Sequence, residues 1–286
     1  MKYKRVLVTS CDLRFAEGAE GLLRSVRHCH PEVASICYVP LREVDALVAR
    51  LGLLARVEAF PVTIEGVPDR SQVTVGRLFA VVPDADAVVY ADADVVFCRP
   101  APELWDIEPG KVNAVQDTSR IISDNLAGVN RELFVRQFPE VAFQKGANSG
   151  VLGLRPQDWK DLPQRFSDAL VKGGFQYEPI IDQPMLNALF APNFRWLPFE
   201  YNSHCLFDRR VPRNVRLVHF TGGVKKPWQP GFPKHEPAYW YWLKYGSSPR
   251  PSRGHLLLAA LWIAVSTPKR KVGQCVRFLL GKGATH

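Results

Sequence analysis

The chain has 286 residues, of which 47% are hydrophobic and 23% charged, proportions typical of a soluble protein with a packed core. This composition excludes a disordered chain, and no apolar run approaches the roughly 20 residues of a membrane-spanning helix. The net charge is +9, but the segment after Glu236 holds eight of the 37 Lys and Arg residues and no Asp or Glu, so the rest carries 29 basic and 28 acidic residues. The positive charge therefore belongs to the C-terminal segment.

Apolar strand-like runs alternate with helical patterns over residues 5–92. Strands are expected at 6–8, 36–39, 57–62 and 87–91, and helices at 19–26, 41–51 and 73–82. This alternation predicts right-handed crossovers and a largely parallel sheet. No Gly-x-Gly-x-x-Gly follows the first strand, so a standard dinucleotide-binding unit is not expected. The first ten residues predict a strand and not a signal peptide.

Two groups of polar residues stand at the ends of these strands. Thr9, Ser10 and Asp12 follow the first strand, and Asp92 and Asp94 end the fourth. Ligands of parallel sheets bind beyond the carboxyl ends of the strands, so both groups are expected at one edge. Because side chains alternate along an extended chain, Asp92 and Asp94 should point to the same side.

A pair of carboxylates at the end of a buried strand is costly unless a positive charge lies between them. A divalent cation is the natural partner of Asp92 and Asp94. The upstream pair Asp84 and Asp86 has the same spacing, but it follows Pro83 with no strand before it. That earlier pair is interpreted as a turn.

The second half of the chain is less regular. Strands are expected at 112–116, 151–154 and 215–220, helices at 159–171 and 183–190, and a Pro-, Gly- and Ser-rich linker at 246–254. Asp117 follows the first of these strands, and His219 ends the last one, just before Thr221-Gly222-Gly223. Two carboxylates and one imidazole suit Mn²⁺ or Mg²⁺ and leave positions for phosphate oxygens, so Asp92, Asp94 and His219 form a candidate metal set.

The glycines after His219 would let backbone N–H groups approach a diphosphate, with Lys226 or Lys225 adding positive charge. Arg77, on the helix before the metal strand, could reach the same phosphates. Taken singly, each residue has a plainer interpretation, because a lone histidine is often structural and paired lysines are often solvated. Their occurrence together favours a phosphate-binding site.

Four ordered segments carry a resemblance to a known family. They are Tyr90-Ala91-Asp92-Ala93-Asp94, Asn148-Ser149-Gly150-Val151, Asp182-Gln183, and His219-Phe220-Thr221-Gly222 leading to Lys226-Pro227-Trp228. In their order and spacing, over roughly residues 5–230, they resemble glycosyltransferase family 8. That family comprises retaining enzymes of the GT-A fold, including glycogenin and bacterial lipopolysaccharide galactosyl- and glucosyltransferases. The resemblance implies an α/β fold with a Rossmann-like, mostly parallel central sheet flanked by helices.

The resemblance also implies a role for each matching position. Metal ligation falls to Asp92, Asp94 and His219, with Mn²⁺ as the expected ion and Mg²⁺ as the alternative. Binding of the nucleotide sugar, from uridine diphosphate (UDP) in most relatives, is implied for Thr9, Asp12, Arg77, Tyr90, Ala93, Asp117, Asn148, Ser149, Gly150, Gly222 and Lys226. Catalysis is implied for Gln183 and Asp182, which lie near the donor sugar.

The chain departs from the family pattern at several positions. Asn-Ser-Gly stands at 148–150 where many members have Asn-Ala-Gly, a small change that keeps the turn expected there. Asp-Gln-Pro stands at 182–184 where Asp-Gln-Asp is common. One residue is inserted after His219, which leaves open whether Lys225 or Lys226 meets the phosphate. Thr9 with Asp12 is a loose match to the first-strand motif.

A bound metal would neutralise the leaving nucleoside diphosphate. No obvious carboxylate nucleophile adjoins the metal pair, unlike the two flanking acids of a retaining glycosidase. We therefore expect front-face attack by the acceptor hydroxyl, with Gln183 as a polar stabiliser and Asp182 as a hydrogen-bond acceptor for a sugar hydroxyl. The expected reaction moves galactose or glucose to a saccharide or lipid-linked acceptor, as in cell-surface polysaccharide or lipopolysaccharide assembly.

Residues 1–236 are expected to form the catalytic domain and residues 237–286 a helical extension. The extension combines aromatic residues at 239–245, an apolar run at 255–265 and the basic cluster at 269–271. These features favour attachment to an anionic membrane, against packing on the domain or on a second subunit. Nucleic-acid binding is not expected, because the body is nearly neutral. The six cysteines show no zinc or C-x-x-C spacing and indicate reduced thiols, consistent with a cytoplasmic protein peripheral to the cytoplasmic face of a membrane.

Three alternative functions are either weakened by single features of the sequence or stay open. A nucleotidyltransferase would need a Gly-rich loop after the first strand, and none is present. A non-catalytic sugar-nucleotide-binding scaffold would be expected to lack one of Asp92, Asp94 or His219, and all three are present. Self-glucosylation of the glycogenin kind stays open, because tyrosines are available, and so does a homo-oligomeric state.

Overall fold

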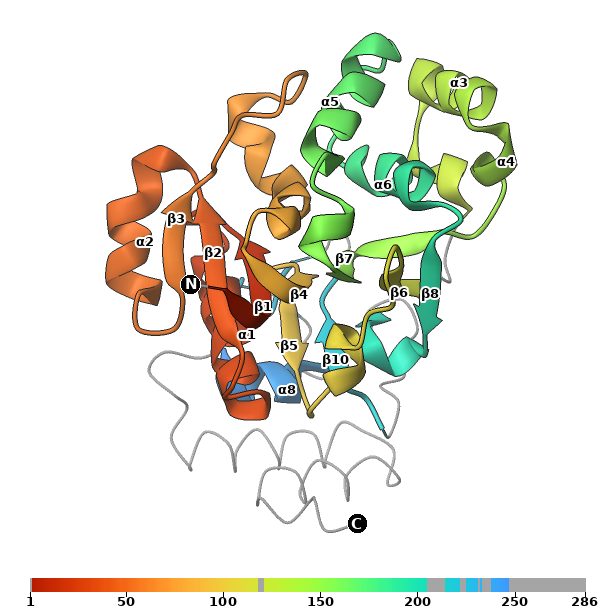
Figure 1. Ribbon diagram of the computed structural model, residues 1–286. Helices are drawn as coiled ribbons and strands as arrows, with labels where there is room; N and C mark the ends of the chain where they lie inside the picture. Colours follow the sequence, from red (N-terminus) through yellow and green to blue (C-terminus); the bar gives the residue numbers. More distant parts are fainter. Residues whose placement is uncertain are drawn as a thin grey trace.

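The computed structural model describes residues 2–117, 121–204, 214–221, 225–230, 232 and 238–246. A seven-stranded sheet runs through the molecule in the order β3-β2-β1-β4-β7-β6-β8, with helices on both of its faces (Figure 1). A three-stranded sheet, β5-β10-β9, adjoins the end of β4. This mixed α/β architecture confirms the fold class expected from the sequence.

The first half of the chain builds four parallel strands and the helices that join them. The elements are β1 (Tyr3–Ser10), α1 (Ala16–Cys29), β2 (Ala34–Val39), η1 (Leu41–Glu43), α2 (Val44–Leu51), β3 (Arg56–Ala59), η2 (Asp69–Val81) and β4 (Ala85–Ala91). The predicted alternation is confirmed, and β1 lies in the centre of this half between β2 and β4. The segment η2 is 3₁₀-helical where the periodicity predicted an ordinary helix.

The second half adds three strands to the same sheet. Its elements are η3 (Pro102–Trp105), β6 (Val112–Gln116), η4 (Ile122–Asn125), α3 (Gly128–Gln137), α4 (Pro139–Ala142), β7 (Ala147–Leu154), η5 (Pro156–Asp158), α5 (Leu162–Lys172), α6 (Asp182–Phe190), β8 (Phe194–Leu197) and η6 (Phe199–Tyr201). Strand β7 runs antiparallel to both of its neighbours, β4 and β6, whereas β8 is parallel to β6. The sheet is therefore mostly parallel with one reversed strand.

The small sheet consists of β5 (Val95–Phe97), β9 (Ser203–His204) and β10 (Leu217–His219). Strand β10 pairs antiparallel with β5 and parallel with β9. Because β5 follows β4 after only three residues, the small sheet begins where the large one ends.

Alternation along the strands divides the core into two hydrophobic clusters, one on each face of the sheet. Val6 and Val8 of β1 pack in the cluster that includes residues of η2, α5 and α6, while Leu7 packs with α1 and α2. All three side chains are fully buried. The near-continuous apolar runs of the first half thus reflect strands covered on both sides.

Helix α8 (Ala238–Tyr245) packs against α1 and β5. Trp242 and Tyr245 are 2% and 3% exposed and lie in a cluster with Phe220 and Phe232. The prediction that these two side chains serve as membrane anchors is therefore wrong, because both are buried in this hydrophobic cluster. Among the described residues no helix is long and apolar enough to cross a membrane. Residues 247–286, including the apolar run and basic cluster, lie outside the described residues.

Two local predictions are also wrong. The segment around Asp84 and Asp86 was expected to be a turn, but β4 begins at Ala85, so Asp86 lies on the strand, where it pairs with Lys2 at 2.7 Å. Residues 148–150 were expected to form a turn, but they lie inside β7. In both cases the start of a strand was placed too late because its first residues are polar or small.

Replacing Trp242 with Ala is expected to lower the free energy of unfolding by about 3–5 kcal/mol, because a large buried side chain is removed. Urea unfolding measures the change, with Leu53→Ala as control, since Leu53 is 93% exposed. Equal stability of the two variants would show that α8 contributes nothing to the fold.

Candidate active site

Strand pairing brings the predicted metal ligands together. Strand β4 ends at Ala91, the chain turns through Asp92 to Asp94 with Val95 N donating to Asp92 O at 3.0 Å, and β5 begins. In the antiparallel pair of β10 and β5, His219 lies opposite Val95. His219 therefore stands directly beside the aspartates, although about 125 residues separate them in the chain.

His219 Nε2 lies 3.2 Å from Asp94 Oδ1 and 3.7 Å from Asp92 Oδ2. The aspartates converge through the tight turn and not through the extended alternation that the sequence suggested. One ligand atom from each of the three residues lies within 4.8 Å of the others, an arrangement that could hold a metal ion.

The donor set of the three residues fits a divalent cation. Two carboxylates and an unprotonated imidazole nitrogen are ligands for Mn²⁺ or Mg²⁺. Gly150 of β7 supplies the space, because a Cβ at this position would lie 2.1 Å from His219 Cε1 and 2.6 Å from Asp92 Oδ2. The absence of a side chain at Gly150 is thus a requirement of the cluster.

Lys226 completes one side of the cluster. Its Nζ lies 2.7 Å from Asp94 Oδ2 and donates to the Phe220 carbonyl oxygen at 2.7 Å. Lys225 is exposed. Burial opposes ionisation of Asp94, but His219 and Lys226 outweigh it and hold the pKa of that carboxyl well below its ordinary value. Of the two lysines, Lys226 is the one in the site.

Arg77 of η2 bridges the other side. Its Nη2 lies 3.0 Å from Asp92 Oδ1, its Nη1 lies 2.8 Å from Asp182 Oδ2, and it donates to Ser149 Oγ. Burial alone would lower the pKa of Arg77, but the Asp182 and Asp92 carboxylates raise it above its ordinary value. Tyr90 OH donates to Asp92 Oδ1 at 2.9 Å, so two donors orient this oxygen.

Gln183 and Asp182 lie at the start of α6, next to β7. Gln183 Nε2 donates to Asp117 Oδ2 at 3.2 Å, and its Oε1 accepts from Asn148 Nδ2 at 3.3 Å and from the Ser149 backbone N–H at 3.2 Å. Burial raises the pKa of the Asp182 carboxyl to about 6, although the Arg77 guanidinium acts in the opposite direction. The structure therefore brings the predicted donor-sugar residues into one connected polar group beside the metal ligands.

Other predicted residues are placed less directly. Thr9 is buried on β1. Asp12 accepts from the backbone N–H groups of Arg14 and Phe15 and pairs with the Arg14 side chain, so it also organises the start of α1. Ala93 is buried in the turn between the two aspartates. Gly222 lies outside the described residues, so its contact with a diphosphate stays a prediction.

Two site residues were missed by the sequence analysis. Asn202 is fully buried, and its Oδ1 lies 2.9 Å from His219 Nδ1. The His204 ring lies 5.7 Å from that of His219, and burial together with His219 lowers the pKa of His204 to about 4, so this imidazole is neutral at pH 7. Neither residue belongs to a recognisable motif. His204 lies opposite His219 in the parallel pairing of β9 with β10, and Asn202 directly precedes β9.

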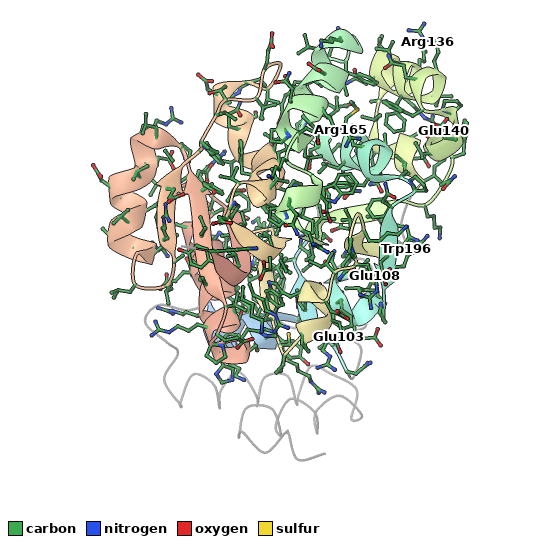
Figure 2. All side chains as sticks on the ribbon, in the orientation of Figure 1. Glu103, Glu108, Arg136, Glu140, Arg165 and Trp196 are labelled. Carbon is green, nitrogen blue, oxygen red and sulfur yellow. The ribbon has the colours of Figure 1, made fainter. Side chains whose placement is uncertain are left out.

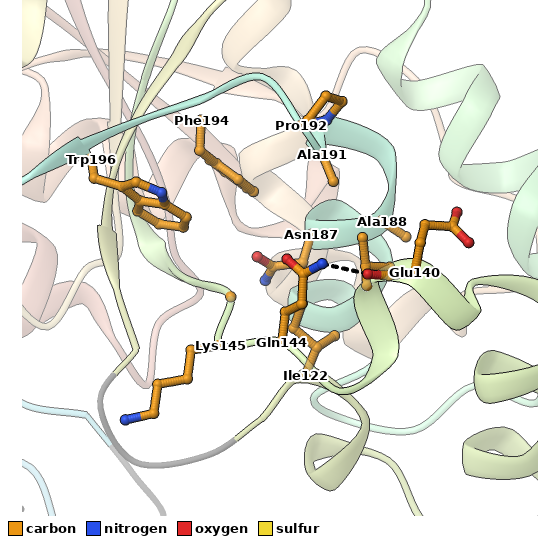
Figure 3. A pocket seen from close by; sticks show the side chains of 12 residues that line it. Ile122, Glu140, Gln144, Lys145, Asn187, Ala188, Ala191, Pro192, Phe194 and Trp196 are labelled. Carbon is orange, nitrogen blue, oxygen red and sulfur yellow. Dashed lines mark hydrogen bonds between the residues drawn. The ribbon is translucent and has the colours of Figure 1, made fainter.

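A pocket of about 520 Å³ lies apart from the metal cluster and contains none of its three ligands (Figure 3). Phe194 and Trp196 of β8 line one side, and Asn187 of α6 and Gln144 line the other. Trp196 lies on the last strand of the sheet (Figure 2) and is 46% exposed. Asn187 connects this pocket to the site, because its side chain also bonds the Gln183 carbonyl oxygen at 2.8 Å.

Comparisons with known proteins identify one family and several similar proteins. The sequence profile of Glycosyl transferase family 8 matches residues 76–230. Glucoside xylosyltransferase 2 of Mus musculus is 24% identical over 176 residues, which make up 52% of this chain. The matched region spans 38% of the length of that relative.

Solved structures show the same fold. The galactosyltransferase LgtC, in complex with donor and acceptor sugar analogs, superposes with a TM-score of 0.59 at 19% identity, over 94% of this chain and 99% of that one. The apo form of the glycosyltransferase GlyE of Streptococcus pneumoniae gives a TM-score of 0.61 at 19% identity, over 93% and 64%.

Replacing Gly150 with Ala is expected to weaken Mn²⁺ binding about tenfold or more, because the new methyl group displaces His219 and Asp92. Binding is measured from the electron paramagnetic resonance signal of free Mn²⁺. Gly153→Ala on the same strand is the control, since its Cβ would meet the Leu104 carbonyl oxygen and not a ligand. An equal loss in both variants would contradict a specific role for Gly150.

Replacing Asp94 with Asn is expected to destabilise the metal-free protein by about 3 kcal/mol at neutral pH, because the buried carboxylate that pairs with Lys226 is lost. The folded-state pKa of Asp94 is depressed, so this stability is present above the unfolded pKa of about 4 and is lost as the pH falls through the folded value. Urea unfolding with chelator should therefore show the gap between the two proteins narrowing below about pH 4. A gap independent of pH would contradict this account.

Proposed function

The chain belongs to glycosyltransferase family 8, and we propose that it is a retaining, Mn²⁺-dependent hexosyltransferase. The GT-A fold expected from the sequence is confirmed by the structural neighbours. In the proposed reaction, galactose or glucose moves from a UDP-sugar to a hydroxyl of a saccharide or lipid-linked acceptor. Mg²⁺ is the alternative ion.

The observation that carries the proposal is the cluster of Asp92, Asp94 and His219 with Lys226 beside it. Two carboxylates and one imidazole can hold a divalent cation, and a lysine at the same place adds a second positive charge for a diphosphate. A cation held there would neutralise the charge that develops on the leaving nucleoside diphosphate. Lys226 Nζ, which pairs with Asp94, would then donate to a phosphate oxygen instead.

The polar residues of β7 and α6 supply the donor-sugar side. Gln183 presents its amide between Asp117 and Asn148, and Asp182 is held by Arg77. Because Asp182 Oδ2 is engaged by the guanidinium, it suits an orienting hydrogen-bond acceptor better than a nucleophile. We propose front-face attack by the acceptor hydroxyl, with the side-chain amide of Gln183, held between Asp117 and Asn148, as a polar stabiliser of the developing positive charge.

The names of the similar proteins support this proposal and widen its test. LgtC is described with donor and acceptor sugar analogs, which supports a sugar nucleotide and a saccharide as the two substrates. The mouse relative is a xylosyltransferase, so UDP-xylose belongs in the donor panel. We further propose that residues 247–286 attach the enzyme to the cytoplasmic face of an anionic membrane, where it would act in cell-surface polysaccharide or lipopolysaccharide assembly. The tail's basic residues and the apolar run 255–265 support this.

The activity is tested by incubating the purified protein and Mn²⁺ with UDP-glucose, UDP-galactose, UDP-xylose and UDP-N-acetylglucosamine, and measuring release of UDP. Metal-dependent release from one hexose donor, abolished by chelator, is the expected result. The anomeric configuration of the product, determined by nuclear magnetic resonance, tests retention. No UDP release from any donor, with or without simple saccharide acceptors, would favour a non-catalytic sugar-nucleotide-binding protein. Attachment of sugar from a radiolabelled donor to the protein itself would favour self-glucosylation.

Replacing Lys226 with Ala is expected to lower kcat/KM by about 100-fold, since a charge at a leaving diphosphate contributes on the order of 3 kcal/mol. Lys225→Ala is the matched control, because Lys225 is the adjacent lysine and is exposed. An equal effect of both changes would contradict the assignment of Lys226 to the diphosphate.

A further inference from the structure

A continuous chain of side-chain hydrogen bonds joins the metal cluster to the donor-sugar residues. It runs from Asp117 through Gln183, Asn148 and Asn202 to His219. The four steps measure 3.2 Å (Gln183 Nε2 to Asp117 Oδ2), 3.3 Å (Asn148 Nδ2 to Gln183 Oε1), 2.9 Å (Asn202 Nδ2 to Asn148 Oδ1) and 2.9 Å (His219 Nδ1 to Asn202 Oδ1). Each member comes from a different segment of the chain.

The direction of this hydrogen-bond chain is determined at two of its three amides, Gln183 and Asn148. The Ser149 backbone N–H donates to Gln183 Oε1 at 3.2 Å, and the Gly150 backbone N–H donates to Asn148 Oδ1 at 3.1 Å. A backbone N–H can only donate, so each of these side-chain atoms must be the amide oxygen. Asn202 therefore turns its NH₂ group toward Asn148.

The carboxylate at the far end imposes the same direction. Asp117 Oδ2 accepts from Gln183 Nε2 at 3.2 Å, so Gln183 turns its NH₂ group toward Asp117 and its oxygen toward Asn148. The orientation of all three amides in the hydrogen-bond chain thus follows from the backbone N–H groups of Ser149 and Gly150, which can only donate.

The last step determines the tautomer of His219. With its NH₂ group used on Asn148, Asn202 presents only its oxygen to the imidazole, and this oxygen must receive the Nδ1–H. The lone pair of a neutral ring is then on Nε2, the atom that faces Asp92 and Asp94. That is the form in which histidine binds a metal, and an acceptor on the other ring nitrogen orients such a ligand.

We propose that Asn202 is a positioning residue that couples the metal centre to Gln183. Through its oxygen it holds His219 in the metal-binding tautomer, and through its NH₂ group it holds Asn148 and hence the Gln183 amide. The inference rests on the proposed function, because it assigns Gln183 to the reacting sugar. Asn202 is fully buried, so water does not compete for either contact.

The two contacts of Asn202 can be separated by two substitutions. Asn202→Asp keeps an acceptor for His219 Nδ1–H but has no donor for Asn148 Oδ1. Asn202→Leu has a similar volume and makes neither hydrogen bond. Asn130→Ala is the control for loss of a buried amide outside the site, since Asn130 Nδ2 bonds the Gln176 carbonyl oxygen and Glu178.

Mn²⁺ affinity is measured from the free-ion resonance signal, and kcat with the best donor is measured on the same preparations. Asn202→Leu is expected to weaken Mn²⁺ binding about tenfold or more and to lower kcat. Asn202→Asp is expected to bind Mn²⁺ as tightly as the unaltered protein while its kcat falls about tenfold. Asn130→Ala should change neither quantity.

Unchanged Mn²⁺ affinity in Asn202→Leu would overturn the link to His219, and unchanged kcat in Asn202→Asp would overturn the link to Gln183. The Mn²⁺ measurement needs no sugar transfer. Failure of the proposed reaction would therefore appear separately from failure of the proposed coupling through Asn202. If Asn202→Leu does not fold, Asn202→Ser replaces it, because serine is too short to reach both partners.

Discussion

The site depends first on the antiparallel pairing of β10 with β5. This pairing places His219 opposite Val95 and lets Phe220 N donate to the Asp94 carbonyl oxygen at 3.0 Å. Without it, the aspartates at the end of β4, one partly buried and the other buried, would lack the imidazole between them and be a costly pair of carboxylates. Helix α8 packs against this small sheet through Trp242 and Tyr245.

The reversed strand β7 is the second constraint. It pairs with β4 so that Asp92 N donates to the Gly150 carbonyl oxygen at 2.8 Å, which brings the Asn148–Gly150 segment against the metal ligands. Two backbone N–H groups of the same segment orient the amides of Gln183 and Asn148. A single strand thus leaves space beside the three candidate metal ligands and orients the amides of Gln183 and Asn148.

The sequence was sufficient for those features that local patterns encode. The parallel half of the sheet followed from the alternation of apolar runs, and Asp92, Asp94 and His219 followed from polar residues at strand ends together with the family resemblance. Asn202 and His204 were not found, because a buried polar residue outside a motif has no local signature and acquires its role from strand pairing. The same limit explains Trp242, whose aromatic character suggested a membrane anchor although tertiary packing buries it.

We propose that Asp92, Asp94 and His219 hold a divalent cation that binds the diphosphate of a uridine nucleotide. Isothermal titration of UDP into the protein with Mn²⁺ and with chelator tests it most directly, with His219→Ala measured alongside. We expect UDP binding that requires Mn²⁺ and that is lost or strongly weakened in His219→Ala. Equal UDP affinity with Mn²⁺ and with chelator, or undiminished binding to the variant, would contradict it.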